Sequence, residues 1–301
     1  MENTRNIENR FQAQVNFFLN LTTSHQATLQ WLRENELLPS RRTCCNELST
    51  ICRNSNSIDG EMFRCTRCGS KENIREGTRW QAFRRVPLVL LVRLIFYYYA
   101  NEYSARRAFD DLAAAQVEIS YATVKRVYCM VRNSVADFMI LEVYEEPLRG
   151  RVQVDEALFT HRAGPGRRGL RQVWVVGFLE EATGEAFCFV VNDRNSRTIN
   201  QLIVNHCHPG THLIHDGWQG HPRIPHISQH HRFLKGRDDP DNTPRIEGVW
   251  GEMRGFLRNI YSAGVVETNV RMMIQELVWR GGCRDRGFEL SDELIEILRE
   301  I

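Results

Sequence analysis

Three features are missing from this 301-residue sequence: a long apolar run, an apolar segment at its start, and a strong net charge. The most apolar run, from Val86 to Ala100, is broken by Arg93 and is too short to span a bilayer. The opening residues, Met1 to Arg5, lead into polar sequence and not into the apolar core of a secretory signal. We therefore expect an intracellular protein without a membrane partner, resident in the nucleus if the host is eukaryotic and in the cytoplasm otherwise.

The net charge of +2 results from 39 Lys and Arg against 37 Asp and Glu, and it neither favours nor excludes a nucleic-acid partner. The distribution of charge along the chain is more informative than its sum. With 42% hydrophobic and 25% charged residues, the composition is that of an ordinary soluble protein. The length allows two or three compact units of roughly 100–150 residues each, with a sizeable core.

Cysteine is unevenly distributed, because five of the nine cysteines lie between residues 44 and 68. In a reducing compartment such a cluster favours metal binding over disulfides. Cys65 and Cys68 form a C-x-x-C-G knuckle, which lets two thiolates reach one ion, but no second C-x-x-C accompanies it. Either Cys44 or Cys45 would have to complete the site together with Cys52, at an unusual spacing.

We expect residues 43–80 to form a zinc-ribbon-like segment, which either binds structural zinc or is a degenerate ribbon without metal. The possible zinc ligands are Cys45, Cys52, Cys65 and Cys68. Ahead of this segment, residues 1–42 carry apolar positions at nearly helical spacing, and Ser24 can cap a helix there. We expect these residues to form an N-terminal helical segment.

Residues 87–139 have the pattern of three helices. Their expected starts are Pro87, Ser104 and Ser120. The last two helices are joined by a short link, and the final one carries Lys125 and Arg126 on its polar side. This arrangement predicts an all-α helix-turn-helix region over residues 81–148 that binds DNA through Lys125 and Arg126, although a plain helical bundle would have the same pattern.

After Gly150 the apolar residues alternate with polar ones, which indicates strands. We expect strands over residues 152–159, 172–179, 186–191 and 211–215, and helices over 196–207, 246–260, 266–280 and 291–301. Ser196 is the expected cap of the first of these helices, and residues 217–244 have no regular pattern. We assign residues 149–301 to one α/β domain with a mixed sheet flanked by helices.

Three meander strands, a helix, a returning strand and a later helix match the order of an RNase H-like fold. Asp155, Asp216 and Glu247 occupy the first strand, the end of the fourth strand and the later helix. We interpret them as a catalytic triad that binds Mg²⁺ or Mn²⁺, because carboxylates suit these ions and would repel one another without them. Two ions about 3.5–4 Å apart would activate water or a 3′-hydroxyl and stabilise the leaving oxygen of a phosphodiester.

Each acid also has a simpler explanation. Asp155 points away from the neighbouring valines and could face solvent, and Asp216 could belong to an ordinary turn. Glu247 could be a first-turn acid that interacts with the helix dipole. Glu156, on the opposite face of its strand, is a weaker alternative ligand than Asp155. The three acids together, in the order of the fold, are a stronger signal than any one of them.

Further DNA contacts are expected around these acids. Residues 162–171 contain several arginines and no acid, and we expect a flexible loop there that binds substrate phosphates through Arg167, Arg168 and Arg171. A solvated loop without a function would have the same composition. His231 lies in a His-rich stretch and is a candidate contact to DNA phosphate or helper of the metal site.

Several short motifs follow one another in a characteristic order along the chain. They are Val154-Asp155-Glu156, Trp174-Val175-Val176-Gly177, Val191-Asn192-Asp193-Arg194, His208-Pro209-Gly210-Thr211, Asp216-Gly217-Trp218, His230-His231-Arg232-Phe233 and Ile246-Glu247-Gly248-Val249-Trp250. With these motifs the chain resembles the Merlin-type DDE transposases and their bacterial insertion-sequence relatives. The upstream Cys knuckle and Gly77-Thr78 also fit the N-terminal layout of that family.

The resemblance implies a metal-dependent DNA transposase, a polynucleotidyl transferase that cleaves transposon ends and joins them to target DNA. It implies Asp155, Asp216 and Glu247 as metal ligands, double-stranded DNA as partner, and a homodimer or larger assembly to join two ends. One departure lies at residue 244, where the family usually has Asn and this chain has Pro. The alternatives are a domesticated, non-catalytic DNA-binding protein derived from a transposase, and a nuclease that cuts without joining.

Overall fold

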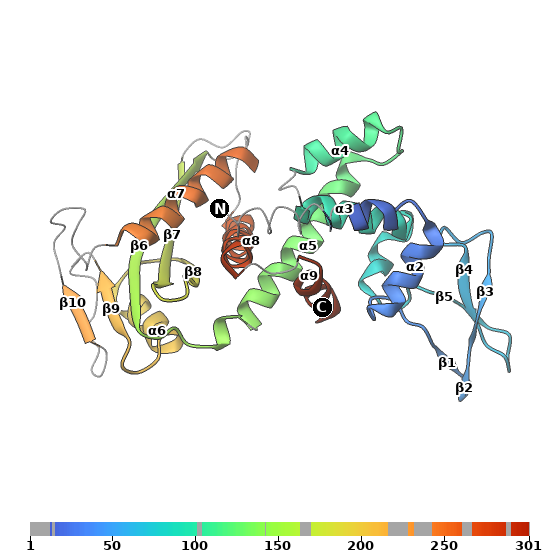
Figure 1. The fold of residues 1–301 in the computed structure, drawn as a ribbon, viewed down its shortest axis with the longest axis horizontal. Helices are drawn as coiled ribbons and strands as arrows, with labels where there is room; N and C mark the ends of the chain where they lie inside the picture. The colour runs from blue at the N-terminus through green and yellow to red at the C-terminus, as the bar shows by residue number, and fades with distance from the viewer. Residues whose placement is uncertain are drawn as a thin grey trace. The chain divides into compact units, whose positions relative to one another are not determined.

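A computed structural model describes residues 13, 16–100, 104–141, 143–162, 170–215, 228–231, 243–260, 267–286 and 290–300. The chain divides into two compact units (Figure 1). Unit 1 consists of Met1–Ser134 and Phe288–Ile301, and unit 2 of Val135–Gly287. Among the helices that the structure describes, none combines the length and the apolar character needed to cross a membrane.

Unit 1 contains several helices and two small sheets. Its elements are α2 (His25–Glu34), β1 (Thr43–Cys44), β2 (Glu47–Leu48), β3 (Thr50–Arg53), β4 (Glu61–Arg64), β5 (Lys71–Asn73), η1 (Arg79–Phe83), α3 (Leu88–Ala100), α4 (Ala105–Ala114), α5 (Tyr121–Leu141, which continues into unit 2) and α9 (Leu290–Glu300). The predicted caps are confirmed: Ser24, Ser104 and Ser120 each accept a hydrogen bond from a backbone N–H three residues later.

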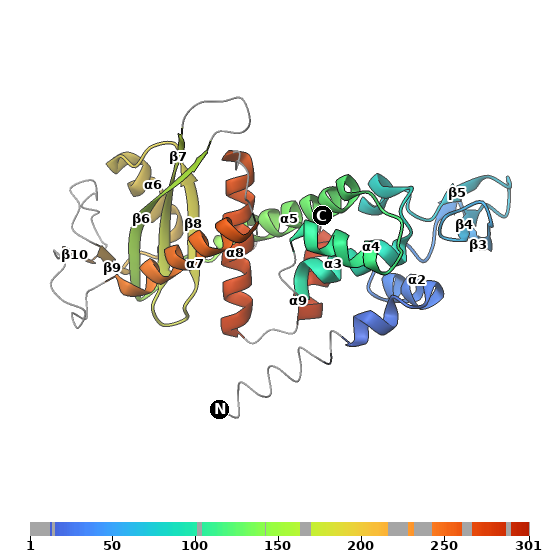
Figure 2. The same ribbon diagram turned by 90° about the horizontal axis from the view of Figure 1, so that it is seen from above.

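The ribbon-like segment is built from antiparallel pairs. β1 pairs with β2, and a second sheet has the order β3-β4-β5 (Figure 2). The β1–β2 hairpin turns through Cys45 and Asn46, whose φ angles are 55° and 61°. Two positive φ angles in succession are typical of the tight hairpin turn that matches the right-handed twist of its strands. This turn therefore determines the direction of the two adjacent cysteines, Cys44 and Cys45.

The core of unit 1 joins its two chain segments. Phe18 stacks on Phe96 with ring centroids 4.9 Å apart, and these rings line a small apolar cavity together with Leu294 and Leu298 of α9. Arg299 of α9 donates a hydrogen bond to the carbonyl of Asn35 at 2.8 Å. Residues 149–301 were expected to form one domain, but α9 groups with unit 1 because its apolar face is buried there.

Unit 2 is built on one mixed sheet with the strand order β10-β9-β6-β7-β8. Its elements are η2 (Val143–Glu145), β6 (Arg151–Arg162), β7 (Leu170–Glu180), β8 (Ala186–Val191), α6 (Ser196–His206), β9 (His212–His215), β10 (Ser228–His231), α7 (Pro244–Ile260) and α8 (Glu267–Arg286). β6, β7 and β8 form an antiparallel meander, whereas β9 runs parallel to β6 and β10 parallel to β9. The strands and helices predicted for this region are confirmed. In the observed strand order, β6 lies at the centre of the sheet.

Successive side chains of a strand point to opposite faces of the sheet. Different helices cover these two faces. α7 packs across β6 and β7 (Figure 1), on the face that carries Asp155 and Gly177, which pair across the two strands. His206, the last residue of α6, stacks on Phe189 of β8 at 4.5 Å on the opposite face. α8 contacts β8 at the edge of the sheet.

Three details differ from the sequence-based expectations. The cap of α6 is Asn195 and not Ser196, and its side chain accepts from the Thr198 N–H at 3.0 Å. The stretch expected to be a loop over residues 162–171 is shorter, because Arg162 and Arg171 belong to β6 and β7. β10 lies in the stretch expected to be irregular, since its residues Ser228-Gln229-His230-His231 include no apolar side chain that would indicate a strand.

Candidate active site and cysteine cluster

Asp155 lies on β6, half-buried, on the face that α7 covers. Its Oδ2 accepts a hydrogen bond of 2.9 Å from the indole Nε1 of Trp250, a buried residue of α7. The strand alternation turns Val152 and Val154 toward the opposite face, where both are buried. Asp155 is therefore not an ordinary solvent-facing acid, because a helix residue 95 positions later in the chain contacts its carboxylate.

The start of α7 is attached to β6 by a buried glutamine. Gln153, two residues before Asp155 on the same face, accepts from the backbone N–H of Ile246 at 3.1 Å. Its amide nitrogen donates to Glu181 at 2.7 Å, and Glu181 also accepts from Arg151 at 2.8 Å. The first N–H groups of a helix have no partner within the helix, so this contact satisfies one of them and holds α7 in place along the strand.

Glu247 lies in the first turn of α7 and is exposed. Arg254, seven residues later and thus on the same side of the helix, has its guanidinium carbon 5.7 Å from the ring centroid of Phe159 on β6. Glu247 therefore lies on the same flank of α7 as Arg254, beside the buried side that Ile246 and Trp250 form against the sheet. Pro244 is the first residue of α7, a position where proline is favoured, so the departure from the family pattern is compatible with this helix.

The second predicted acid, Asp216, lies outside the described residues. The residue before it, His215, is buried at the end of β9, the parallel neighbour of β6. In that pair Ile214 is opposite Gln153, two residues before Asp155. On the other side of β9, His231 of β10 pairs in register with His215. The short β10 thus brings a residue of the His-rich stretch next to the strand that leads to Asp216.

The predicted DNA contacts fall on both units. On α5, Lys125 and Arg126 are exposed, with the ammonium of Lys125 4.8 Å from the Tyr121 ring. Arg126 donates to the carbonyl of Ala82 at 3.2 Å. Lys125 is therefore the better placed of the two for an intermolecular contact. In unit 2, Arg171 belongs to β7 and His231 to β10, whereas Arg167 and Arg168 lie outside the described residues.

Four thiols of the ribbon-like segment converge: the sulfur atoms of Cys44, Cys45, Cys65 and Cys68 all lie within 4.8 Å of one another. The sulfur of Cys44 is 3.8 Å from that of Cys45 and 3.7 Å from that of Cys68. A tetrahedron of thiolates about 2.3 Å from zinc has sulfur–sulfur edges of roughly 3.8 Å. The cluster therefore has the composition and the dimensions of a structural zinc site, and it could hold a metal ion.

The expected set of zinc ligands needs one correction, since Cys44 belongs to the cluster and Cys52 does not. Cys52 lies on β3 and pairs with Met62 of β4, away from the hairpin turn. The turn at Cys45 and Asn46 brings both adjacent cysteines to the C-x-x-C knuckle. The Cys44-Cys45 dipeptide, followed by an Asn that tolerates positive φ, was the sequence signal for this turn.

The surroundings of the four thiols affect them unequally. The Cys68 backbone N–H donates to the sulfur of Cys65 and is the main reason that the pKa of Cys65 is lowered to about 7. Hydrogen bonds with the other thiols, above all Cys68, raise the pKa of Cys44 to about 12. Cys65 is thus the thiol most readily available as thiolate, and a metal ion would have to displace protons from its neighbours.

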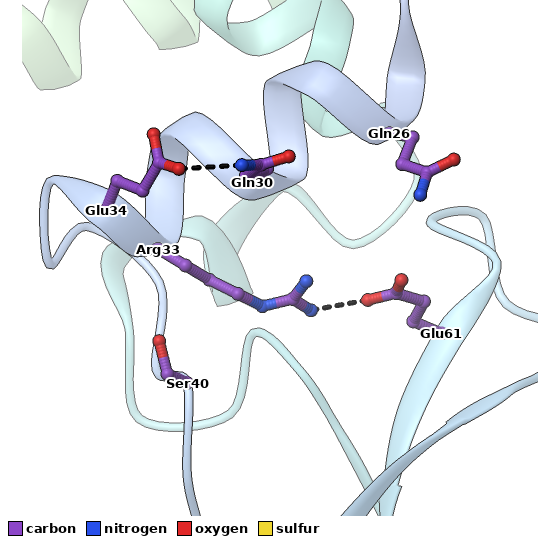
Figure 3. Close-up of a pocket in the computed structure, with 6 residues that line it drawn as sticks. All are labelled: Gln26, Gln30, Arg33, Glu34, Ser40 and Glu61. Carbon is purple, nitrogen blue, oxygen red and sulfur yellow. Dashed lines mark hydrogen bonds and ion pairs between the residues drawn. The ribbon is translucent and has the colours of Figure 1, made fainter.

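A polar pocket of about 340 Å³ lies elsewhere in unit 1, between α2 and β4 (Figure 3). Arg33 in this pocket donates to Glu61, and Gln30 donates to Glu34 at 2.7 Å. With one arginine and two glutamates, the lining has a net charge of −1. The pocket is therefore unsuited to a DNA phosphate, and the candidate site remains on the sheet of unit 2.

Trp250 and Gln153 are site residues that the sequence did not single out. Trp250 appeared in the sequence analysis only as the last residue of a motif, and its N–H contact gives no sequence signal. Gln153 stands between two strand valines, which was the only hint in the sequence, and the structure shows it buried with the partners that a buried amide requires.

Comparison with known proteins gives a family match for part of the chain. No curated protein matches the chain. Residues 147–281 match the family model described as the ISXO2-like transposase domain. The matched residues contain the five-stranded sheet, Asp155 and Glu247, and they end within α8. The match supports the assignment of this part of the chain to an insertion-sequence type of transposase domain.

Proposed function

We propose that the protein is a DDE transposase of the Merlin type, which binds transposon-end DNA and catalyses metal-dependent phosphodiester cleavage and strand transfer. The observation that carries this proposal is the placement of Asp155 on the central strand, in contact with Trp250 of α7, the helix that carries Glu247 in its first turn. The match of residues 147–281 to a transposase domain supports the same activity. Asp216 is the proposed third member of the triad, next in the chain to His215 of β9.

The fold that we propose for unit 2 is RNase H-like. Its sheet order, with a meander β6-β7-β8 and two parallel strands added beside β6, is the order expected for that fold. In such a sheet the first and fourth strands, here β6 and β9, are neighbours. Acids on β6, at the end of β9 and at the start of α7 are then the natural set of convergent ligands.

The proposed ligands of Mg²⁺ or Mn²⁺ are Asp155, Asp216 and Glu247, because carboxylate oxygens suit hard divalent cations. Two such ions, when bound, supply an activated nucleophile and stabilise the leaving oxygen. Two observations support this set: the Trp250 N–H donates to Asp155 on β6, and the same helix, α7, carries Glu247 in its first turn.

DNA recognition is proposed for the α4–α5 pair and for the basic residues of unit 2. Lys125 on α5 would contact phosphates, and Arg167, Arg168, Arg171 and His231 would hold DNA near the triad. Joining two transposon ends to one target requires two active sites, so we propose a homodimer or larger assembly on DNA.

The decisive test is a strand-transfer assay with the full chain, Mg²⁺ or Mn²⁺, and labelled duplexes from the genomic segments that flank its coding sequence. We expect metal-dependent cleavage and joined products from the wild type, and neither from Asp155→Ala or Glu247→Ala. The matched control is Glu252→Ala, a second exposed acid of α7, which should retain both reactions. Cleavage without joining would favour a nuclease, and binding without cleavage a non-catalytic DNA-binding protein.

A further inference from the structure

The contact between Trp250 and Asp155 is specific in its geometry. Trp250 is buried, with 2% of its surface exposed, and its indole N–H would be a buried donor without the carboxylate. The rest of the side chain packs among apolar groups, with Phe159 in an edge-on contact at 6.2 Å. A buried N–H without a partner is costly, so the indole has a strong preference for the orientation that reaches Asp155.

This contact depends on a missing side chain. Gly177 of β7 pairs with Asp155 across the strands, and the Trp250 ring lies directly against it. A Cβ atom at residue 177 would be 2.7 Å from Cζ2 of Trp250 and 3.1 Å from Cδ1 of Ile246. Any other residue would push the indole away from the strand and thus away from the carboxylate. The absence of a side chain at Gly177 therefore allows the Trp250 ring to lie beside Asp155.

The same helix is fixed along β6 by the bond between Gln153 and the N–H of Ile246. Ile246 and Trp250 are one helical turn apart, so the two polar contacts hold the first turns of α7 at two points of one strand. Glu247 lies between these two points in the sequence. A shift of α7 would thus move Glu247 and the donor to Asp155 together.

We infer that Trp250 is a positioning residue for Asp155: its indole N–H fixes the orientation of the carboxylate and couples it to the helix that carries Glu247. The inference rests on the proposed function, since Asp155 is a metal ligand only in that reading. Hydrogen bonds that orient metal ligands commonly affect metal affinity or activity by about 10- to 100-fold. Trp250 is assigned this role through Asp155 and without contact to DNA or metal.

The test removes the hydrogen-bond donor of Trp250, once with the shape of the side chain kept and once with a smaller ring. Trp250 is substituted by the benzothienyl analogue of tryptophan, in which sulfur replaces the N–H, and by Phe. We expect both variants of the full chain to bind Mn²⁺ about 10- to 100-fold more weakly and to cleave DNA more slowly by a similar factor. DNA affinity in the presence of a chelator, and the thermal midpoint of the benzothienyl variant, should be those of the wild type. Trp174→Phe, a substitution of a half-buried tryptophan on β7, is the matched control and should leave Mn²⁺ affinity unchanged.

A second readout does not require activity. In protein labelled with ¹⁵N at its indoles, the Trp250 signal is identified by its loss in Trp250→Phe. We expect this signal to shift in Asp155→Asn and to broaden on addition of Mn²⁺, and the Trp174 signal to stay in place in Asp155→Asn.

The inference is overturned if the benzothienyl variant binds Mn²⁺ and cleaves DNA like the wild type. It is also overturned if the Trp250 indole signal has the same position in Asp155→Asn as in the wild type. A wild type that binds Mn²⁺ and broadens the Trp250 signal but cuts no DNA would contradict the proposed function while supporting the link between Trp250 and Asp155.

Discussion

At the scale of single residues, the deepest charges of unit 1 are Asp59 and Arg75, both fully buried. The guanidinium donates to both carboxylate oxygens at 2.5 Å and to the carbonyls of Phe83 and Val86 at 2.8 Å. The backbone N–H of Leu88, the first residue of α3, also donates to Asp59 at 3.2 Å. This network connects the ribbon-like segment to the start of the helical region.

Removal of the Arg75 side chain would leave the charge of Asp59 buried without its ion-pair partner. We expect Arg75→Ala to lower the free energy of unfolding by about 3–5 kcal/mol, measured by urea denaturation. The control is Arg84→Ala, which breaks an exposed pair with Glu76 and should cost less than about 1 kcal/mol. Equal effects of the two substitutions would show that the buried network contributes no more than a surface pair.

The cysteine cluster gives a second prediction at this scale. We expect Cys44→Ser and Cys65→Ser to lose bound zinc, because each removes a thiol from the group of four. Cys52→Ser should retain the zinc content of the wild type, since Cys52 lies outside that group. Elemental analysis of the purified proteins measures this directly. Loss of zinc in Cys52→Ser with retention in Cys44→Ser would restore the ligand set predicted from sequence.

At the scale of elements, the packing of α7 on the sheet depends on Gly177. Gly177→Ala places a methyl group against the Trp250 ring and should destabilise the protein by about 1–3 kcal/mol. In a Trp250→Phe background the same substitution should cost clearly less, because Phe lacks the Cζ2 and Cη2 atoms of the indole that would be struck. Urea unfolding of the four proteins gives the coupling energy. Additivity within about 0.5 kcal/mol would contradict this packing.

The α5 helix gives a prediction about DNA binding. If Lys125 contacts a phosphate, Lys125→Ala should weaken binding to all duplexes alike and reduce the slope of log affinity against log salt by about 1. Lys125→Arg retains the charge and should retain most of the slope. The measurement is fluorescence anisotropy with a labelled duplex over a salt series. An unchanged slope in Lys125→Ala would remove this residue from the DNA-binding surface.

At the scale of the whole molecule, the two ends of the chain complete one unit. Leu298 of α9 lines the apolar cavity with Phe18 and Trp31, although about 270 residues separate them in sequence. We expect Leu298→Ala to cost about 2–5 kcal/mol and to reduce hydrogen-exchange protection in α2 and α3. The sheet of unit 2 should retain its protection. Glu296→Ala, an exposed position of α9, is the control and should change neither.

Much of the secondary structure could be predicted from the sequence because the signals for it are local. Ser24, Ser104 and Ser120 cap helices where their side chains reach a backbone N–H three residues later. The alternation around Val152 and Val154 placed β6 and turned Asp155 to the opposite face. By contrast, β10 could not be predicted, since its residues Ser228–His231 are all polar and its pairing with β9 is made in the folded sheet.

The helices, most strands of unit 2, the cysteine knuckle and the candidate acids for metal binding could be predicted from the sequence alone. These follow from periodicity, capping and spacing, which act over a few residues. Three findings required the folded structure. Cys44, and not Cys52, belongs to the cluster of four thiols, α9 groups with unit 1, and Trp250 donates to Asp155. The physical reason is that these contacts join residues far apart in the chain, so they depend on strand register, on the direction of a turn and on the room that one glycine leaves for an indole ring.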